Sequence, residues 1–351
     1  MKAVRMYAPG DLRVEDVPVP APKADEVLIQ VKAVGVCGSD IPRANQYGAH
    51  VMPITLGHEF SGVVTKAGGE VDRVHEGDRV VVAPLVPCFA CTWCKMGEYS
   101  LCENYNYYGS RCDGAMAEYV AVKQGNVLKL PDGVSYEDAA TVDPCANALH
   151  ALACAHFRKN DSVTVYGVGP IGLYILQCAK AMGASFVACV DIWDEKLDIC
   201  KRLGADLAVN SRGQKPEEAV RARTNGEGTH IVIDCTGAPS AQLCAVRTAA
   251  KLGRVVLLGI SHRGLELTDR DVDAVMRGEL CLSGSWNSFG KPFPGPDWTN
   301  AVALFAKGAI SSRELVSHRL PLDEAPAIFR RIAEGGFYFN KILFLPEENG
   351  K

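Results

Sequence analysis

The chain has 351 residues, of which 48% are hydrophobic, and a formal net charge of −4 at pH 7. This length favours two domains over a single core, and the weak negative charge argues against nucleic acid or an anionic membrane as a partner. No apolar run is long enough to span a bilayer, and the N-terminal residues MKAVRMYAPG lack the apolar core of a signal peptide. We therefore expect a cytoplasmic protein with a small-molecule partner. In that compartment the fourteen cysteines of the chain are expected to stay free or to bind metal.

Strand patterns dominate the first part of the chain, at 27–34 and 78–83. From about residue 160, buried strands alternate with helical patterns. The strands are expected at 162–166, 186–190, 230–234 and 254–258, and the helices at 171–182 and 195–203. Two amphipathic helices, near 298–307 and 323–334, then precede a last strand at 341–345.

The alternation predicts an α/β fold with a parallel sheet that helices cover on both faces. We place this doubly wound domain at residues 147–284. It interrupts a β-rich domain that is made of residues 1–146 and 285–351.

Four cysteines form the most specific local pattern in the chain, Cys88-x2-Cys91-x2-Cys94-x7-Cys102. Such short spacings let the thiolates converge on one ion. Four sulfurs complete a tetrahedral shell that suits zinc and leaves no open position for chemistry. We predict a structural zinc site in a lobe at about residues 86–105. A chance cluster of thiols, disulfides and an iron–sulfur site are the alternatives.

A glycine-rich turn, Gly167-Val168-Gly169-Pro170-Ile171-Gly172, follows the strand at 162–166 and opens a helix, which is the context of a dinucleotide-binding loop. The glycines allow a tight turn and a close approach of the pyrophosphate to the helix N-terminus. Asp191 ends the next strand. A carboxylate there accepts hydrogen bonds from ribose hydroxyls and repels a 2′-phosphate, which predicts NAD rather than NADP. Lys196 either lies near the adenosine or is a solvated helix lysine, and a glycine-rich turn of an unrelated fold is the alternative for the loop.

Two short segments, Cys37-Gly38-Ser39-Asp40 and Gly57-His58-Glu59, supply a thiolate, an imidazole and a carboxylate. Taken singly, such a cysteine is usually a core residue and such a histidine a structural one. Taken together, the three groups form a mixed set that suits zinc. The residues alone do not show that the two segments meet.

These segments, the four-cysteine lobe and the glycine-rich turn occur in the order of the zinc-containing medium-chain alcohol dehydrogenases, which the whole chain resembles. The resemblance is closest to the polyol dehydrogenase branch and to enzymes of the galactitol-1-phosphate 5-dehydrogenase type. The segments that carry it are CGSDIPR at 37–43, PITLGHEFSG at 53–62, PCF at 87–89, GSR at 109–111 and GSW at 284–286.

The resemblance implies a GroES-like fold for the β-rich domain and two zinc ions per chain. The catalytic ion has Cys37 and His58 as ligands, and Glu59 binds it directly or exchanges with water. The further carboxylate of the family falls at Asp143, where related enzymes carry Glu, so Asp143 reaches the ion directly or through water, or else caps a helix. Ser39 begins a proton relay, with helix capping as its alternative, and Asp40 orients the histidine.

The predicted reaction moves a hydride between NAD and a secondary alcohol of a polyol or polyol phosphate. Arg111 is the main candidate for a substrate phosphate, because guanidinium matches phosphate oxygens well, and its alternative is an ion pair with Asp113 or Glu118. Arg43, His50 and Trp286 are weaker substrate candidates.

Three rival functions remain open at this point: a sorbitol-type, threonine or simple alcohol dehydrogenase, an inactive zinc-binding relative, and a redox sensor. An edge strand near residues 281–284 favours a homodimer or homotetramer, as in related enzymes.

Overall fold

The computed structural model describes residues 1–261 and 263–346. Contacts between residues divide the chain into two compact units. The first unit comprises residues 1–143 and the chain from Phe289 onward, and the second unit comprises Pro144–Ser288. These limits lie three and four residues from those expected from the sequence. The difference has a local cause, because Cys145 lies against Cys178 of the second unit, and the Ser285 amide donates to the Leu257 carbonyl of the same unit.

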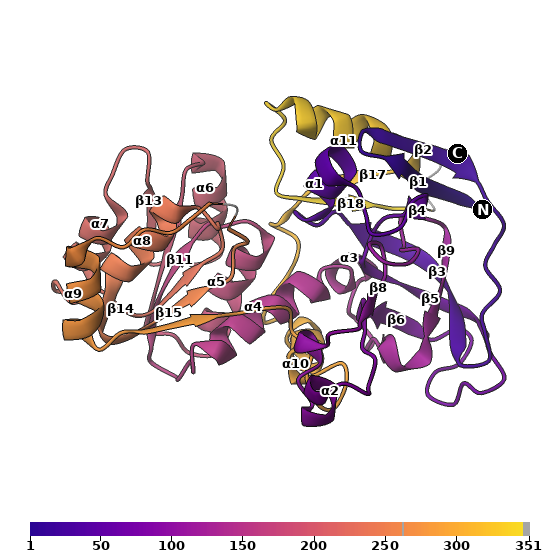
Figure 1. The fold of residues 1–351 in the computed structure, drawn as a ribbon, viewed down its shortest axis with the longest axis horizontal. Helices are drawn as coiled ribbons and strands as arrows, with labels where there is room; N and C mark the ends of the chain where they lie inside the picture. Colours follow the sequence, from indigo (N-terminus) through magenta and orange to yellow (C-terminus); the bar gives the residue numbers. More distant parts are fainter. Residues whose placement is uncertain (262, 347–351) are drawn as a thin grey trace. The chain divides into compact units, whose positions relative to one another are not determined.

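The first unit is built mainly from antiparallel strands (Figure 1). Its strands are β1 (Lys2–Ala8), β2 (Asp11–Asp16), β3 (Glu26–Gly35), β4 (Ile54–Thr55), β5 (Glu59–Ala67), β6 (Arg79–Val82), β7 (Leu85–Val86), β8 (Asn106–Tyr107), β9 (Tyr119–Lys123), β10 (Val127–Lys129), β17 (Val316–Leu320) and β18 (Lys341–Phe344). A seven-stranded sheet has the order β10-β6-β5-β3-β18-β17, with β9 also paired to β3. A three-stranded sheet, β2-β1-β4, and the pair β7-β8 complete the unit.

The helices of the first unit are short or lie near its C-terminal part. They are α1 (Asp40–Pro42), a π-helical turn (Arg43–Tyr47), α2 (Thr92–Met96), α3 (Tyr136–Ala139), α10 (Pro296–Ala306) and α11 (Ala325–Glu334), with single 3-10 turns at Tyr99–Leu101, Gln124–Asn126 and Leu322–Glu324. Helix α4 (Val142–Cys154) crosses the limit between the units. The amphipathic helices expected near 298–307 and 323–334 correspond to α10 and α11.

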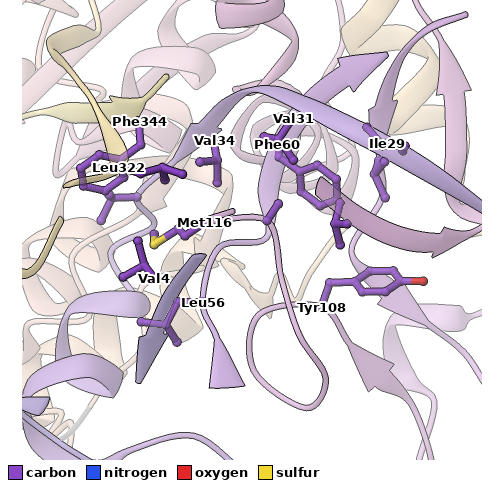
Figure 2. Packing of buried hydrophobic residues seen from close by; sticks show 14 of the residues in the cluster. Val4, Ile29, Val31, Val34, Leu56, Phe60, Tyr108, Met116, Leu322 and Phe344 are labelled. Carbon is purple, nitrogen blue, oxygen red and sulfur yellow. The ribbon is translucent and has the colours of Figure 1, made fainter. Parts of the chain in front are cut away.

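Alternating apolar side chains of the strands form the core of the first unit. Figure 2 shows Val31, Val34 and Phe60 of β3 and β5 gathered with Met116 and Phe344. All five side chains are almost completely buried. This packing fixes the register of β3 against β5, because a shift by one residue would turn each apolar side chain to the other face of the sheet.

The second unit is a parallel sheet with strand order β13-β12-β11-β14-β15-β16. Its strands are β11 (Ser162–Tyr166), β12 (Phe186–Asp191), β13 (Leu207–Asn210), β14 (Thr229–Asp234), β15 (Ala249–Leu257) and β16 (Cys281–Gly284). Its helices are α5 (Pro170–Ala181), α6 (Asp194–Arg202), α7 (Pro216–Arg223), α8 (Pro239–Thr248) and α9 (Asp269–Gly278). The predicted doubly wound α/β fold, joined to a β-rich domain, is confirmed. Among the described residues, no helix has the length and apolarity needed to cross a membrane.

Candidate active site

The pairing of β3 with β5 brings the two candidate zinc segments together. Gly35, the last residue of β3, lies opposite Glu59, the first residue of β5. Cys37 therefore follows β3 at the same edge of the sheet where His58 precedes β5. One ligand atom from each of Cys37, His58 and Glu59 lies within 4.8 Å of the others. A side chain at Gly35 would place its Cβ 2.5 Å from a Glu59 carboxylate oxygen, so glycine leaves the room that this carboxylate occupies.

Asp40 lies behind His58. Its side chain is completely buried and accepts hydrogen bonds from the Cys37 amide (3.1 Å, Oδ2) and from Arg43 Nη1 (2.8 Å, Oδ1). His58 Nδ1 lies 3.4 Å from Asp40 Oδ1, beyond ordinary hydrogen-bond length, and this buried nitrogen has no hydrogen-bond partner among the described residues. Burial opposes a charge on His58, but Asp40 and the Cys37 sulfur raise its pKa well above the ordinary value.

Lys341 is a member of this cluster that the sequence prediction did not include. It begins β18, and its ammonium donates to Glu59 Oε2 at 2.5 Å and to the Val36 carbonyl at 3.0 Å. Both Lys341 and Glu59 have side chains that are only 2% exposed. The lysine therefore balances the buried carboxylate. The sequence shows a lysine at the start of the last predicted strand, 282 positions from its partner, and the resemblance to the family implied a place near the cofactor phosphates rather than beside Glu59.

Asp143 lies near the cluster without joining the set of converging ligand atoms. It is the second residue of α4 rather than the residue that caps it, and its side chain is buried. Burial raises the pKa of the Asp143 carboxyl to about 7. The positive charge of His58 lowers this pKa, whereas the negative charge of Glu59 raises it. At this cluster, the ligand atoms that converge within 4.8 Å among the described residues come from Cys37, His58 and Glu59, without Asp143.

Tyr107 is a second site residue that the sequence prediction missed. Its ring meets the His58 ring edge-on at 5.5 Å between centroids. Burial raises the pKa of its phenol well above the ordinary value, and the negative charges of Asp143 and Cys37 act in the same direction. Tyr105 contacts Tyr107 edge-on at 6.2 Å, and the Arg111 guanidinium lies 4.5 Å above the Tyr105 ring. A continuous series of ring contacts therefore runs from His58 through Tyr107 and Tyr105 to Arg111.

The four predicted lobe cysteines come together within the first unit. Their Sγ atoms all lie within 4.8 Å of one another, with Cys88 and Cys94 3.9 Å apart and Cys91 and Cys102 4.0 Å apart. Four sulfurs at about 2.3 Å from a tetrahedral zinc would be about 3.8 Å apart, so the set fits the ion. All fourteen cysteines are free, which rules out the disulfide alternative. Amide donors at Ala90 and Cys91 lower the pKa of Cys88 to about 6, which favours its thiolate.

The glycine-rich turn of the second unit joins β11 to α5. Gly167 has a φ of +84°, which favours glycine, and a Cβ on Gly172 would lie 2.2 Å from the Gly167 carbonyl. A Cβ on Gly169 would meet nothing within 4 Å, and Gly169 caps the helix that Pro170 and Ile171 begin. Open space at a helix N-terminus fits a pyrophosphate.

Asp191 ends β12 beside this turn. Its Oδ2 accepts from the Val168 amide at 2.9 Å, and its Oδ1 accepts from the Ile192 and Trp193 amides at 2.7 and 3.1 Å. The backbone therefore fixes the carboxylate against the glycine-rich turn. Lys196 lies half-buried on α6, five residues further along the chain.

The predicted substrate residues divide between the units. Arg111, Arg43 and His50 belong to the first unit and Trp286, 51% exposed, to the second. Arg111 Nε is buried without a hydrogen-bond partner among the described residues. The expected alternative for Arg111 is wrong, because Asp113 pairs with Arg5 at 2.7 Å and Glu118 accepts from the Lys2 amide at 2.8 Å. Burial lowers the pKa of His50, and the positive charges of Arg111 and Arg43 add to this effect.

Comparison with known proteins agrees with this architecture. Residues 23–132 match the alcohol dehydrogenase GroES-like domain family, and residues 170–307 match the zinc-binding dehydrogenase family. Galactitol 1-phosphate 5-dehydrogenase of Escherichia coli (strain K12) is 37% identical over 347 residues, covering 99% of this chain and 100% of the relative. D-arabitol-phosphate dehydrogenase of Enterococcus avium is 35% identical and covers 99% of this chain and 98% of its own.

Solved structures give the same result. The crystal structure of galactitol-1-phosphate dehydrogenase from Escherichia coli has a TM-score of 0.94 and 37% identity, covering 99% of this chain and 100% of that one. A zinc-binding dehydrogenase from Sinorhizobium meliloti 1021, bound to NADP, has a TM-score of 0.91 and 31% identity, covering 98% and 99%. With two domain families matched in order and full-length identity above one third, the chain belongs to the zinc- and nicotinamide-dependent alcohol dehydrogenase family.

Proposed function

We propose that this enzyme oxidises a secondary alcohol of a polyol or polyol phosphate, of the galactitol 1-phosphate kind, with NAD as the hydride acceptor. The observation that carries the proposal is the convergence of Cys37, His58 and Glu59, in which the buried His58 Nδ1 has no hydrogen-bond partner among the described residues. A thiolate, an imidazole and one carboxylate leave an open position for a substrate hydroxyl.

Two zinc ions per chain are part of the proposal. Cys37 and His58 hold the catalytic ion, Glu59 binds it directly or in exchange with water, and Asp143 acts on it through water because its carboxylate stands outside the converging set. When bound, this ion acts as a Lewis acid that lowers the pKa of the substrate hydroxyl. Cys88, Cys91, Cys94 and Cys102 hold the second ion, which stabilises the lobe and takes no part in the reaction.

The side chains around the cluster handle the proton and orient the alcohol. Ser39 Oγ donates to Cys37 Sγ at 3.3 Å, which holds its hydroxyl beside the candidate metal site, and we assign this hydroxyl the first step of the proton relay. This hydroxyl makes no helix-capping hydrogen bond. The Tyr107 phenol, held beside His58, is suited to bind a hydroxyl next to the reacting carbon.

NAD binding rests on the second unit. The open space at Gly169 and the N-terminus of α5 accommodate the pyrophosphate. The fixed Asp191 carboxylate accepts hydrogen bonds from the adenosine ribose and disfavours a 2′-phosphate. Lys196 is assigned to the adenosine side of the same site.

The phosphate of the substrate is assigned to Arg111. A buried guanidinium nitrogen without a partner is costly unless an acceptor arrives, and phosphate oxygens suit it. Arg43 adds positive charge near Arg111, His50 is assigned as a hydrogen-bonding partner of the phosphate, and Trp286 is retained as a pocket residue on the second unit.

We further propose a cytoplasmic homo-oligomer that acts in carbohydrate metabolism. None of the fourteen cysteines, all of which the structure describes, forms a disulfide, as expected in a reducing compartment. Strand β16 ends the parallel sheet with Cys281 exposed, and Leu282 and Met276 nearby are 38% and 66% exposed. An uncovered strand edge with apolar neighbours favours pairing with a second copy, and Cys281 allows thiol cross-linking to test it.

The experiment is NADH formation at 340 nm with galactitol 1-phosphate, galactitol, sorbitol and threonine. We expect galactitol 1-phosphate to have the highest kcat/KM and NADP to replace NAD poorly. Higher kcat/KM for sorbitol or threonine would transfer the proposal to the sorbitol-type or threonine dehydrogenases. Absence of NADH formation in zinc-replete protein would favour an inactive relative, and reversible oxidation that releases zinc from the lobe would favour a redox sensor.

A further inference from the structure

Arg43 has a contact that substrate binding does not require. Its Nη1 donates to Asp40 Oδ1 at 2.8 Å, and the Arg43 side chain is itself only 16% exposed. Asp40 and Arg43 are three positions apart, and the backbone from α1 into the π-helical turn places them on one side. The ion pair is therefore fixed by local structure rather than by a long flexible reach.

Asp40 stands between Arg43 and His58. The Asp40 carboxylate is fully buried, and its Oδ1 faces both the Arg43 guanidinium and His58 Nδ1. The oxygens of a buried carboxylate need hydrogen-bond donors within the protein, and those donors fix its position. The Cys37 amide supplies one donor to Oδ2, and Arg43 supplies the only formal cation that hydrogen-bonds Asp40 among the described residues.

The Arg43 contact also sets where the carboxylate points. Arg43 holds Oδ1 at 2.8 Å, whereas His58 Nδ1 remains at 3.4 Å from the same oxygen without a hydrogen bond. A zinc-binding histidine depends on the group that receives its second nitrogen, because this partner fixes the tautomer and orientation of the ring. The position of Oδ1, and thus the support for His58, depends on Arg43.

We propose that Arg43 is a positioning residue for the catalytic metal: it holds the Asp40 carboxylate, through Oδ1, in the place that orients the zinc ligand His58. The proposal rests on the proposed function, because it takes Cys37 and His58 as zinc ligands. It gives Arg43 a role in metal retention that is separate from any contact with a substrate phosphate.

The test measures zinc release from the loaded full-length enzyme into an excess of a chromophoric chelator. The variants are Arg43→Met, Arg43→Lys, Asp40→Asn and the double variant Arg43→Met/Asp40→Asn. Arg13→Met is the matched control, because Arg13 also binds an aspartate, Asp11, at 2.8 Å on the exposed surface of the same unit. A Cys37→Ser variant identifies which release phase belongs to the catalytic site, and the four-cysteine phase is the internal reference.

We expect Arg43→Met to speed the Cys37-dependent release by about 10- to 100-fold and to leave the four-cysteine phase unchanged. Arg43→Lys should keep part of the retention, because it preserves the charge without the fork geometry. The double variant should release zinc no faster than Asp40→Asn, since Arg43 acts through Asp40. Arg13→Met should match the wild type.

Zinc release from Arg43→Met at the wild-type rate would overturn the proposal. A double variant whose release rate rises by the product of the two single-variant increases would overturn it as well. If Arg43→Met does not fold, Arg43→Lys and Asp40→Asn decide the same question. If the wild-type enzyme shows no Cys37-dependent zinc at all, the proposed function fails at its zinc site, and that outcome is distinguishable from a failure of the Arg43 assignment.

Discussion

Replacing Lys341 by Met should destabilise the first unit strongly. Lys341 and Glu59 are each 2% exposed and 2.5 Å apart. At an effective dielectric constant of about 20, two charges at that distance attract by about 7 kcal/mol, and desolvation of the two ions cancels most of this. The cost of the substitution therefore arises mainly from a stranded Glu59 carboxylate, which corresponds to about 3–5 kcal/mol.

The assay is urea unfolding at one fixed zinc concentration, followed by tryptophan fluorescence in a Trp193→Phe/Trp286→Phe background, so that the signal comes from the first unit, where Trp298 is completely buried. With a urea dependence of about 2 kcal/mol per molar, the midpoint should fall by about 2 M. Lys341→Met/Glu59→Gln should be more stable than Lys341→Met by about 2 kcal/mol, because it removes the uncompensated charge.

The control is Lys129→Met, which removes a lysine from an exposed pair with Asp78 (2.7 Å) in the same unit. This change should cost no more than about 1 kcal/mol. The reasoning would be refuted by a Lys341→Met protein as stable as the control, or by a double variant that loses the sum of the two single effects.

Three further predictions concern the cofactor, the substrate and acid stability. Asp191→Ser should lower the ratio of kcat/KM for NAD to that for NADP by at least about 10-fold, and an unchanged ratio would remove Asp191 from the ribose site. Tyr107→Phe should lower kcat/KM for a polyol by about 5- to 10-fold while a simple secondary alcohol is unaffected, and equal losses would exclude a hydrogen bond to a second hydroxyl. Hydrogen bonds from Arg247 (2.7 Å) and Thr268 hold the pKa of the Asp271 carboxyl below its ordinary value. The ionised Asp271 carboxylate therefore stabilises the fold above about pH 4, and this stabilisation is lost as pH falls. Arg247→Met should lower the free energy of unfolding by about 2 kcal/mol at pH 7. A loss that stays the same towards pH 2 would contradict this dependence of stability on the ionisation of Asp271.

The fold was predictable because its signals are local. Strands such as β11 are short runs rich in β-branched residues, helices such as α6 keep a 3.6-residue period, and the glycine-rich turn stands between a strand and a helix. The four-cysteine set was predictable for the same reason, since short spacing alone brings the thiols near one another. The limits of the second unit were less well predicted, because they depend on contacts of Cys145 and Ser285 that have no sequence pattern.

The candidate catalytic cluster depends on register, which sequence patterns do not give. Cys37 meets His58 because Gly35 lies opposite Glu59 in the sheet, and only the resemblance to known enzymes linked the two segments beforehand. Lys341 reaches Glu59 through the pairing of β18 with β3, and Tyr107 reaches His58 through the chain that follows the lobe. Such partners are far apart in sequence and carry no motif of their own.

The most direct test of the central claim compares zinc content and NADH formation in the wild type, Cys37→Ser and Cys154→Ser. Cys154 is a free thiol at the end of α4, in the second unit, and serves as the matched cysteine control. The account predicts two zinc ions per chain and polyol-dependent NADH formation for the wild type and Cys154→Ser, and one zinc ion without NADH formation for Cys37→Ser. A Cys37→Ser enzyme that keeps both ions and reduces NAD at the wild-type rate would contradict it.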